Sequence, residues 1–197
     1  MSSVRGKLFK PKLIVLSAPS GSGKTTIVRE LLKRHPEMQF SVSATTRAKR
    51  EFEIEGRDYF FLTKQQFEAY IHQGRLLEWE QIYGEYYGTL TSEVDKALRE
   101  GKSMLFDIDV KGAVSIKKHY PHESMLLFIK PPSIEVLTDR LTKRKTEDRE
   151  AIRRRLERVP MELEQAKEFD VCIINDDLDK AVIAIDDIIS HAITAAV

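Results

Sequence analysis

One short segment near the start of the chain has residues whose types and spacing suit a nucleoside triphosphate. An apolar run at 13–16 leads directly into a turn with two glycines, a lysine and two threonines. Such a turn between a strand and a helix directs backbone N–H groups and the positive helix end at one anion. Lys24 would reach the β- and γ-phosphates, and the Thr25 hydroxyl would bind Mg²⁺. The predicted ATP site comprises Ala18, Pro19, Ser20, Gly21, Ser22, Gly23, Lys24, Thr25 and Thr26.

This segment departs from the pattern G-x-x-x-x-G-K-[ST] at one position, where Ala18 replaces the first glycine. Alanine at a strand end needs only ordinary backbone angles. Gly21 and Gly23 remain where the backbone must curl around phosphate. A chance Gly-Lys-Thr turn would lack the strand before it and the helix after it, and the sequence predicts both.

A second group of residues, between 36 and 90, suits an acceptor that carries a phosphate. Arg47 and Arg50 flank a loop, and Tyr59 and Tyr87 lie at the ends of short predicted strands. Arginine offers a rigid fork of donors and tyrosine one donor on a stiff ring, which together match a dianionic phosphate. Two surface arginines and two core tyrosines would give the same residue types, so these alone leave both interpretations open.

A carboxylate in the same segment indicates which base the acceptor carries. Strand alternation turns Glu78 away from its apolar neighbours Leu77 and Trp79. A carboxylate there could accept from N1–H and N2–H₂ of guanine, whereas adenine presents a lone pair at N1. The unpaired carboxylate could reject adenine by roughly 10⁴-fold, so the chemistry favours guanine.

The predicted apolar strand over 104–109 ends in two further carboxylates. Asp107 and Asp109 lie two residues apart at its C-terminal end, which faces the ligand crevice in open α/β sheets. We expect Asp109 to hold Mg²⁺ through water and Asp107 to reach the acceptor. Asp109 also suits the cap of a helix that begins near Val110, which is compatible with a role in binding.

The charge-dense stretch 142–158 predicts a lid, for which we select Arg140, Arg144 and Arg155. Cations that arrive on closure would neutralise charge where the donor and acceptor phosphates meet in the transition state. The acceptor needs no catalytic base, because a phosphate monoester with a second pKa of about 6 is mostly dianionic at pH 7.

The elements that must position these residues predict an α/β fold. Short apolar runs at 13–17, 103–108, 125–129 and 171–174 alternate with helical patterns, which is typical of buried parallel strands. We expect a P-loop, doubly wound parallel sheet, an inserted mixed or antiparallel substrate subdomain and a helical lid. The predicted helices cover 25–34, 91–100, 110–119, 133–143, 149–167 and 178–195, and the predicted insert strands cover 40–43, 58–62, 76–82 and 86–88. The predicted core covers 12–35, 91–141 and 159–197, the insert 36–90 and the lid 142–158.

The composition narrows the class of protein further. The 197 residues suit one folding unit with an insert. Lys and Arg total 32 against 31 Asp and Glu, a net charge of +1 that disfavours a nucleic-acid binder. The lone Cys172 lies in an apolar run, where we expect a buried strand residue and no disulfide. Without a signal-peptide or membrane-span pattern, the expected location is the cytoplasm, with no membrane partner.

Together these motifs resemble the guanylate kinase family of nucleoside monophosphate kinases, from about residue 12 to residue 189. The resemblance implies conversion of ATP and GMP, with dGMP as a further candidate acceptor, to the diphosphates with Mg²⁺. It lies in the segments 17–26, 41–47, 56–59, 77–79, 86–89, 105–112, 128–133 and 175–178.

The resemblance also implies roles for individual residues. The acceptor phosphate would contact Arg47, Arg50, Tyr59 and Tyr87, with Glu53 in the same loop, and the guanine would contact Ser43, Glu78, Thr89 and Asp107. Asn175 would lie beside the ATP base. The residues expected to act in catalysis are Lys24, Arg47, Arg140, Arg144 and Arg155. The chain departs from the family pattern at three positions, with Lys49 for proline, Phe52 for glycine and Lys145 for glycine.

Two alternatives remain besides the nucleic-acid binder. Domains similar to guanylate kinase also serve as peptide-binding scaffold modules, but these lose phosphate-loop residues, whereas Gly21, Gly23, Lys24 and Thr25 are present here. A kinase for a phosphorylated sugar would leave Glu78 without a purpose. The sequence is compatible with a monomer or a homodimer.

Overall fold

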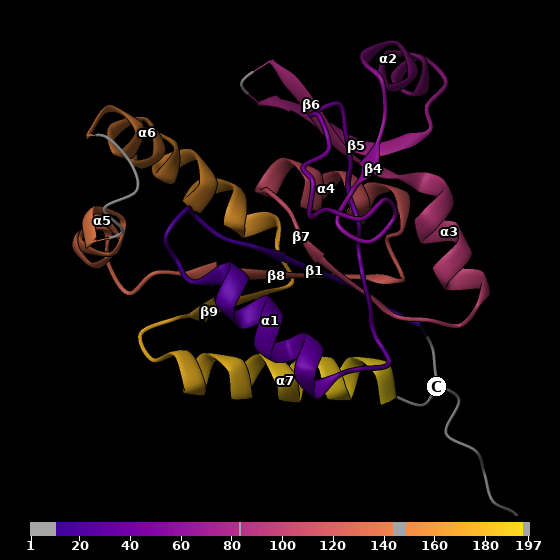
Figure 1. Cartoon of the computed structure of the whole chain (residues 1–197). Helices are drawn as coiled ribbons and strands as arrows, with labels where there is room; N and C mark the ends of the chain where they lie inside the picture. The colour runs from indigo at the N-terminus through magenta and orange to yellow at the C-terminus, as the bar shows by residue number, and fades with distance from the viewer. Residues whose placement is uncertain (1–10, 83, 144–148, 195–197) are drawn as a thin grey trace, which may run out of the picture.

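The core of the structure is a five-stranded sheet (Figure 1). It consists of β1 (Leu13–Ser17), β2 (Gln39–Phe40), β7 (Met104–Asp107), β8 (Ser124–Lys130) and β9 (Val171–Ile174). All strands run parallel, in the order β2-β7-β1-β8-β9. The computed structural model describes residues 11–82, 84–143 and 149–194. Every residue of β1 is buried, as expected for a central strand with both faces covered.

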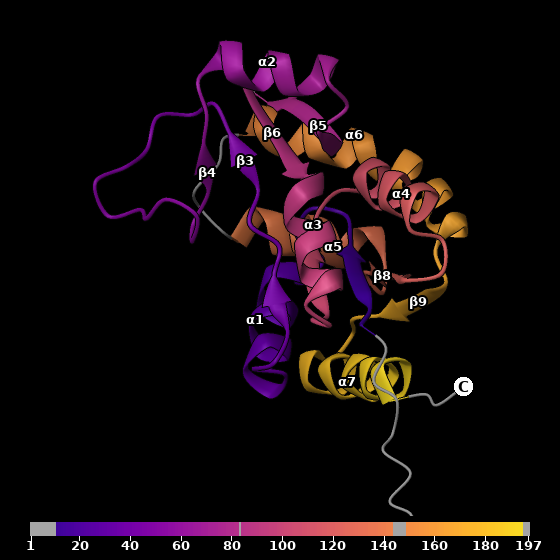
Figure 2. The same cartoon turned by 90° about the vertical axis from the view of Figure 1, so that its right-hand side faces the viewer.

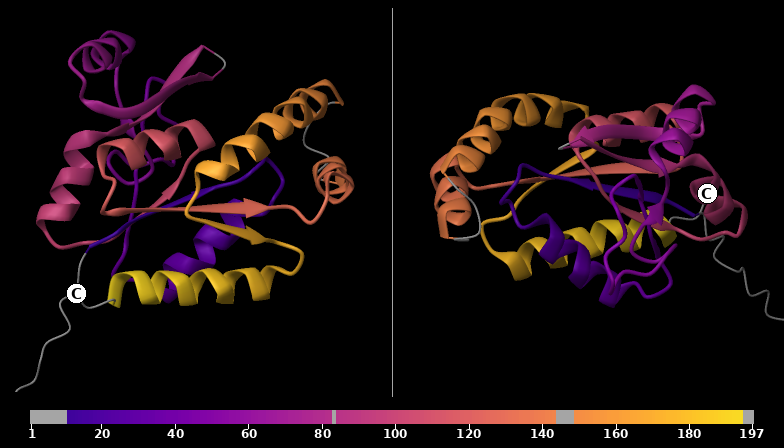
Figure 3. Two further views of the ribbon diagram at one scale, coloured as in Figure 1. Left: turned by 180° about the vertical axis from the view of Figure 1, so that it is seen from behind. Right: turned by 45° about the horizontal axis from the view of Figure 1, so that its top comes forward.

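Helices cover both faces of this sheet (Figures 1 and 3). One face packs against α1 (Lys24–Arg34) and α7 (Leu178–Thr194). The opposite face packs against α3 (Thr91–Arg99) and α4 (Val110–His119). The predicted doubly wound α/β fold is therefore confirmed.

A second, four-stranded sheet stands to one side of the core sheet (Figure 2). It consists of β3 (Ala44–Thr45), β4 (Phe60–Phe61), β5 (Leu76–Ile82) and β6 (Glu85–Leu90). Its order is β4-β3-β6-β5, with β3 and β4 parallel and the other pairs antiparallel. The prediction of a mixed or antiparallel sheet here is confirmed, while the boundaries of core, insert and lid stay predictions.

The insert also contains a helix that the sequence reasoning missed, α2 (Lys64–His72). Thr63 and Gln66 form a capping box at its N-terminus, in which each side chain accepts a hydrogen bond from the other residue's backbone N–H. Thr-x-x-Gln before an apolar position is a sequence pattern for a helix start, so this element was predictable.

The expectation of an insert strand over 40–43 is wrong. Gln39 and Phe40 pair in parallel with Met104 and Leu105 of the core sheet, and the first strand of the second sheet begins at Ala44. A run of this length predicts an extended backbone but carries no information about which sheet receives it.

The expectation that Cys172 is buried is also wrong, because its side chain is exposed. β9 is an edge strand, in which Ile173 faces the core formed with α7 while Cys172 and Ile174 face outward. The apolar run resembles a central strand, but only one of its faces is covered.

Two helices lie beyond the C-terminal ends of the core strands (Figure 3). They are α5 (Ile134–Lys143) and α6 (Arg149–Gln165), which pack on each other through Leu137, Leu141 and Val159. A short 3₁₀ turn, η1 (Ala166–Glu168), connects α6 to β9. Among the described residues, no helix has the length and apolar character needed to cross a membrane.

Candidate active site

The phosphate loop between β1 and α1 requires glycine at two positions. Gly21 and Gly23 have φ angles of 93° and 92°, a left-handed conformation that residues with a Cβ disfavour. A Cβ on Gly23 would also lie 2.5 Å from Nδ2 of Asn175. Because α1 begins at Lys24, the first N–H groups of this helix, which have no partner within it, lie next to the loop.

A cavity of about 490 Å³ lies in front of this loop. Ser22 is an exception among the predicted ATP residues, because its side chain is fully buried and its carbonyl accepts a hydrogen bond from Asn175 Nδ2 at 2.7 Å. Asn175 does not line the cavity, whereas the other predicted residues of the loop line it: Ala18, Pro19, Ser20, Gly21, Gly23, Lys24, Thr25 and Thr26.

Lys24 joins the phosphate loop to the end of β7. Its Nζ lies 2.7 Å from Oδ1 of Asp107 and donates a hydrogen bond of 2.7 Å to the carbonyl oxygen of Ile108. Both side chains of the ion pair are about one-fifth exposed. Asp107, which was expected near the acceptor, is thus held by the lysine expected near the donor.

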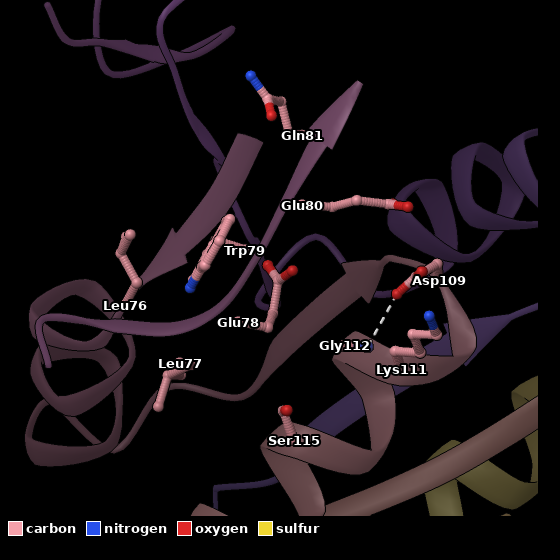
Figure 4. Close-up of a pocket in the computed structure, with 10 residues that line it drawn as sticks. All are labelled: Leu76, Leu77, Glu78, Trp79, Glu80, Gln81, Asp109, Lys111, Gly112 and Ser115. Atoms are coloured by element: carbon pink, nitrogen blue, oxygen red, sulfur yellow. Dashed lines mark hydrogen bonds between the residues drawn. The ribbon is translucent and has the colours of Figure 1, made fainter. Parts of the chain in front are cut away.

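Asp109 lies at the boundary between two cavities. Its Oδ1 accepts a 2.8 Å hydrogen bond from Gly112 N–H (Figure 4). Asp109 therefore caps α4, which is one of the two roles expected for it. The residue also lines the cavity in front of the phosphate loop and a second cavity, of about 430 Å³, between β5 and α4. Its other oxygen, Oδ2, lies 3.9 Å from Nη2 of Arg158, which lines the first of these cavities.

Arg47, Tyr59 and Tyr87 come together on one face of the second sheet. The Arg47 guanidinium carbon lies 5.2 Å from the centre of the Tyr59 ring, and this ring lies 6.2 Å from that of Tyr87. A positive fork beside two phenol rings is an arrangement that can bind a phosphate. Three of the four residues predicted for the acceptor phosphate are therefore close to one another.

Within this group, Glu53 holds Arg47 in place. Its side chain is only 7% exposed and accepts hydrogen bonds from Nη1 and Nη2 of Arg47, at 3.1 and 2.7 Å, and from the backbone N–H of Arg50, at 2.8 Å. The Arg47 guanidinium keeps the pKa of the Glu53 carboxyl below its ordinary value. Arg50 joins the site through its backbone, while its side chain is exposed.

Glu78 and Thr89 face each other across β5 and β6. The Thr89 hydroxyl, buried in the sheet, donates a 2.6 Å hydrogen bond to Oε1 of Glu78. Glu78 also lines the second cavity, where Figure 4 shows it between β5 and α4. Burial raises the pKa of Glu78 to about 7, and the nearby charges of Asp109 and Glu80 raise it too.

The surroundings of Glu78 differ from a regular strand. A bulge between Leu76 and Glu78 interrupts the alternation, so Leu77 is buried while Trp79 is 47% exposed. The expected shared apolar face of Leu77 and Trp79 is therefore wrong. Ser43, another predicted base contact, is half-buried directly before β3.

The lid arginines approach the phosphate loop from two sides. Nη1 of Arg155 donates a 2.6 Å hydrogen bond to the Ser20 hydroxyl, while Nη2 of Arg140 donates a 3.1 Å hydrogen bond to the carbonyl of Asn175. Asn175 is 3% exposed and lines a third cavity, of about 360 Å³, on the far side of Gly21. Arg144 lies outside the described residues.

Sequence reasoning did not select Glu80, Arg158 and Glu162, although all three line the cavity in front of the phosphate loop. Glu80 is two residues from Glu78 on the same strand, so the same alternation placed it on this face. Glu162 is one helical turn from Arg158, and its Oε1 lies 3.7 Å from Nε of Arg158. These spacings were visible in the sequence, but the approach of α6 to β5 was not.

The comparisons with known proteins agree with this arrangement. A sequence model of the guanylate kinase family matches residues 10–192. The guanylate kinase of Chlorobium luteolum is 50% identical over 174 residues, 88% of each chain. That of Salinibacter ruber is 50% identical over 171 residues, 86% of this chain and 90% of its own. This chain belongs to the guanylate kinase family. The crystal structure of the guanylate kinase from Anaplasma phagocytophilum shares its fold, with a TM-score of 0.72 at 29% identity over 94% of this chain and 87% of that one.

This member of the guanylate kinase family has its unusual loop residues at the surface. Lys49 is exposed and Phe52 is 74% exposed, both in the loop that Figure 2 shows projecting from β3 and β4. Neither residue displaces Glu53 from Arg47. Lys145 lies outside the described residues.

The contacts of Glu53 lead to a prediction for the variant Glu53→Gln. Loss of the carboxylate charge weakens its hold on Arg47, so the KM for GMP rises by roughly 10-fold while kcat changes less. Steady-state kinetics with GMP varied at saturating Mg-ATP measure both values. Glu51→Gln, an exposed change in the same loop, is the matched control. A KM equal to that of the wild type would show that Glu53 does not position the acceptor site.

The raised pKa of Glu78 leads to a prediction about stability. Since the folded state holds this proton up to about pH 7 and an ordinary carboxyl loses it near pH 4.5, folding is favoured at low pH and stability falls as pH rises between these values. Glu78→Gln removes this titration. The variant should therefore gain stability relative to the wild type from pH 5 to pH 8, by on the order of 3 kcal/mol. Urea unfolding without nucleotide, at pH 5 and at pH 8, measures the free energy of unfolding of both proteins. If the variant and the wild type differed by the same amount at both pH values, the raised pKa of Glu78 would be contradicted.

Proposed function

We propose that this chain uses the two adjoining cavities to transfer the γ-phosphoryl group of ATP to GMP. Membership of the guanylate kinase family implies ATP-dependent phosphorylation of GMP to GDP. The observation that carries the residue assignments is the shared wall, because Glu80 and Asp109 line both the cavity at the phosphate loop and the cavity at Glu78. The γ-phosphate of ATP and the single phosphate of GMP, bound on either side of this wall, would face each other.

The donor side would hold ATP through the phosphate loop. Backbone N–H groups at the start of α1 and the Lys24 ammonium meet the phosphates. Asn175 would contact the base, since its buried Oδ1 has no hydrogen-bond partner among the described residues and can accept from an amino group.

The acceptor side would hold GMP through two sets of residues, one for its phosphate and one for its base. Arg47, Arg50, Tyr59 and Tyr87 bind the phosphate. Glu78 accepts from guanine N1–H and N2–H₂, a contact that requires its ionised form. Thr89 and Ser43 stand beside the base, and Asp107 connects this side to Lys24.

Two oxygen donors of the cavity at the phosphate loop fit Mg²⁺. The Thr25 hydroxyl and the Asp109 carboxylate line one cavity, and these hard oxygen donors suit Mg²⁺. Within the described residues, no group of three histidines, cysteines or acids could hold a metal ion by itself. A site with one or two protein oxygens, completed by phosphate oxygens and water, is typical of Mg²⁺ with nucleotides. Bound there, the ion would neutralise charge on the transferring phosphoryl group.

The lid would complete the site when both substrates are bound. Arg155, Arg140 and Arg144 would bring positive charge to the phosphates, and α6 would exclude the water that otherwise takes the γ-phosphoryl group. Transfer would be direct and in line, since the acceptor phosphate is already deprotonated at pH 7. The proposal also includes a cytoplasmic location, where both nucleotides occur, a monomer or homodimer, and no nucleic-acid or membrane partner.

An ADP-release assay with Mg-ATP and each of GMP, dGMP, AMP, CMP and UMP tests this function. We expect turnover with GMP and, of the others, at most with dGMP. Lys24→Ala should lower kcat by about 10²–10³-fold while GMP still binds, because Lys24 contacts the donor phosphates.

Turnover with no nucleotide would contradict the proposed activity, and equal turnover with GMP and AMP would contradict the role of Glu78. Comparable loss of GMP binding and turnover in Lys24→Ala would remove Lys24 from the donor site.

A further inference from the structure

One arginine of α6 lies where three parts of the structure meet. Nη2 of Arg158 is 3.8 Å from Oε1 of Glu80 on β5 and 3.9 Å from Oδ2 of Asp109 at the start of α4. Its Nε is 3.7 Å from Oε1 of Glu162 on its own helix. One guanidinium thus faces the second sheet, the end of a core strand and α6 at the same time.

A second arginine on the same helix makes a direct comparison possible. Arg153 pairs with Glu150 at 2.9 Å and with Glu157 at 3.5 Å, both within α6. Both arginines are exposed and lie on the same helix, but their partners differ, and of the two only Arg158 lines the cavity in front of the phosphate loop. Loss of Arg153 therefore removes contacts within a helix, whereas loss of Arg158 removes contacts between elements.

We propose that Arg158 is a positioning residue that couples closure of the insert to closure of the lid through its ion pair with Glu80, a role that rests on the proposed transfer to GMP. An exposed pair at this separation adds little to stability. Closure of α6 and β5 over the substrates shortens the pair and excludes water from it, which strengthens the attraction. The pair therefore favours the state in which both elements cover the site.

A simpler electrostatic role would make the opposite prediction for Glu80. Glu80, Asp109 and Glu162 all line the cavity that receives the ATP phosphates. If Arg158 only neutralised these carboxylates, removal of the Glu80 charge would make the cavity less negative and improve nucleotide binding. If the pair couples the two elements, removal of either partner weakens closure.

A double-mutant cycle on kcat/KM for GMP, at saturating Mg-ATP, separates the two roles. Arg158→Gln and Glu80→Gln should each lower kcat/KM by about 5-fold or more, mainly by a higher KM. The double variant should lose no more than either single one, and Arg158→Lys should retain most of the activity. Arg153→Gln should leave kcat/KM unchanged. Wild-type or higher kcat/KM in Glu80→Gln, or losses that multiply in the double variant, would overturn the coupling.

A distance measurement detects closure without turnover. The sole cysteine is replaced by Cys172→Ser, and spin labels are attached at Gln65→Cys on α2 and Glu164→Cys on α6, both exposed. With ADP and GMP bound, the label distance should become shorter and narrow in this background and after Arg153→Gln. It should stay broad after Arg158→Gln or Glu80→Gln. Identical distance distributions in all four proteins would refute the coupling. Absence of GMP turnover in the unlabelled wild type would instead refute the proposed function itself.

Discussion

The ion pair between Lys24 and Asp107 is the contact on which the arrangement of the site depends. At 2.7 Å it joins the phosphate loop after β1 to the end of β7, the neighbouring strand in the core sheet. Parallel pairing of these two strands brings both residues to the same edge, where the ligand crevice of an open α/β sheet lies. The two cavities proposed for the substrates meet at this edge, where Asp109 lines both of them.

The second sheet holds one buried and one half-buried carboxylate, Glu53 and Glu78, each with a defined partner. Glu53 is held by Arg47, and Glu78 is held by Thr89. Glu78 is costly to ionise in the absence of ligand, which its raised pKa of about 7 expresses. Two N–H donors of guanine would offset that cost, while the lone pair of adenine would add to it, so the unfavourable environment of Glu78 is the physical basis of its proposed selectivity.

The sequence predicted the phosphate loop and its strand and helix because that motif is local. Gly21, Gly23 and Lys24 act through backbone geometry and nearest neighbours, and every such feature could be inferred from spacing. The sheet that receives Phe40 and the outward face of Cys172 depend on which segments lie alongside, and spacing does not contain that information. For the same reason the sequence placed Arg47 and Glu53 in one site but did not show that the carboxylate orients the arginine.

Elements far apart in the sequence set the remaining features. Arg158 meets Glu80 only because the fold brings α6 close to β5, and Asn175 supports Ser22 across 153 positions of the chain. The helix α2 is different, since its capping box at Thr63 was visible and was overlooked. Local chemistry was therefore predictable here, and contacts between elements required the fold.

The proposed function depends above all on Glu78, which would select guanine in a cavity that adjoins the phosphate loop. The most direct test is the ratio of kcat/KM for GMP to that for AMP, measured in the wild type and in Glu78→Gln with Mg-ATP saturating. A neutral amide can donate to adenine N1 as well as accept from guanine, so the ratio should fall by about 10²-fold or more. An unchanged ratio would remove Glu78 from base recognition and contradict the account.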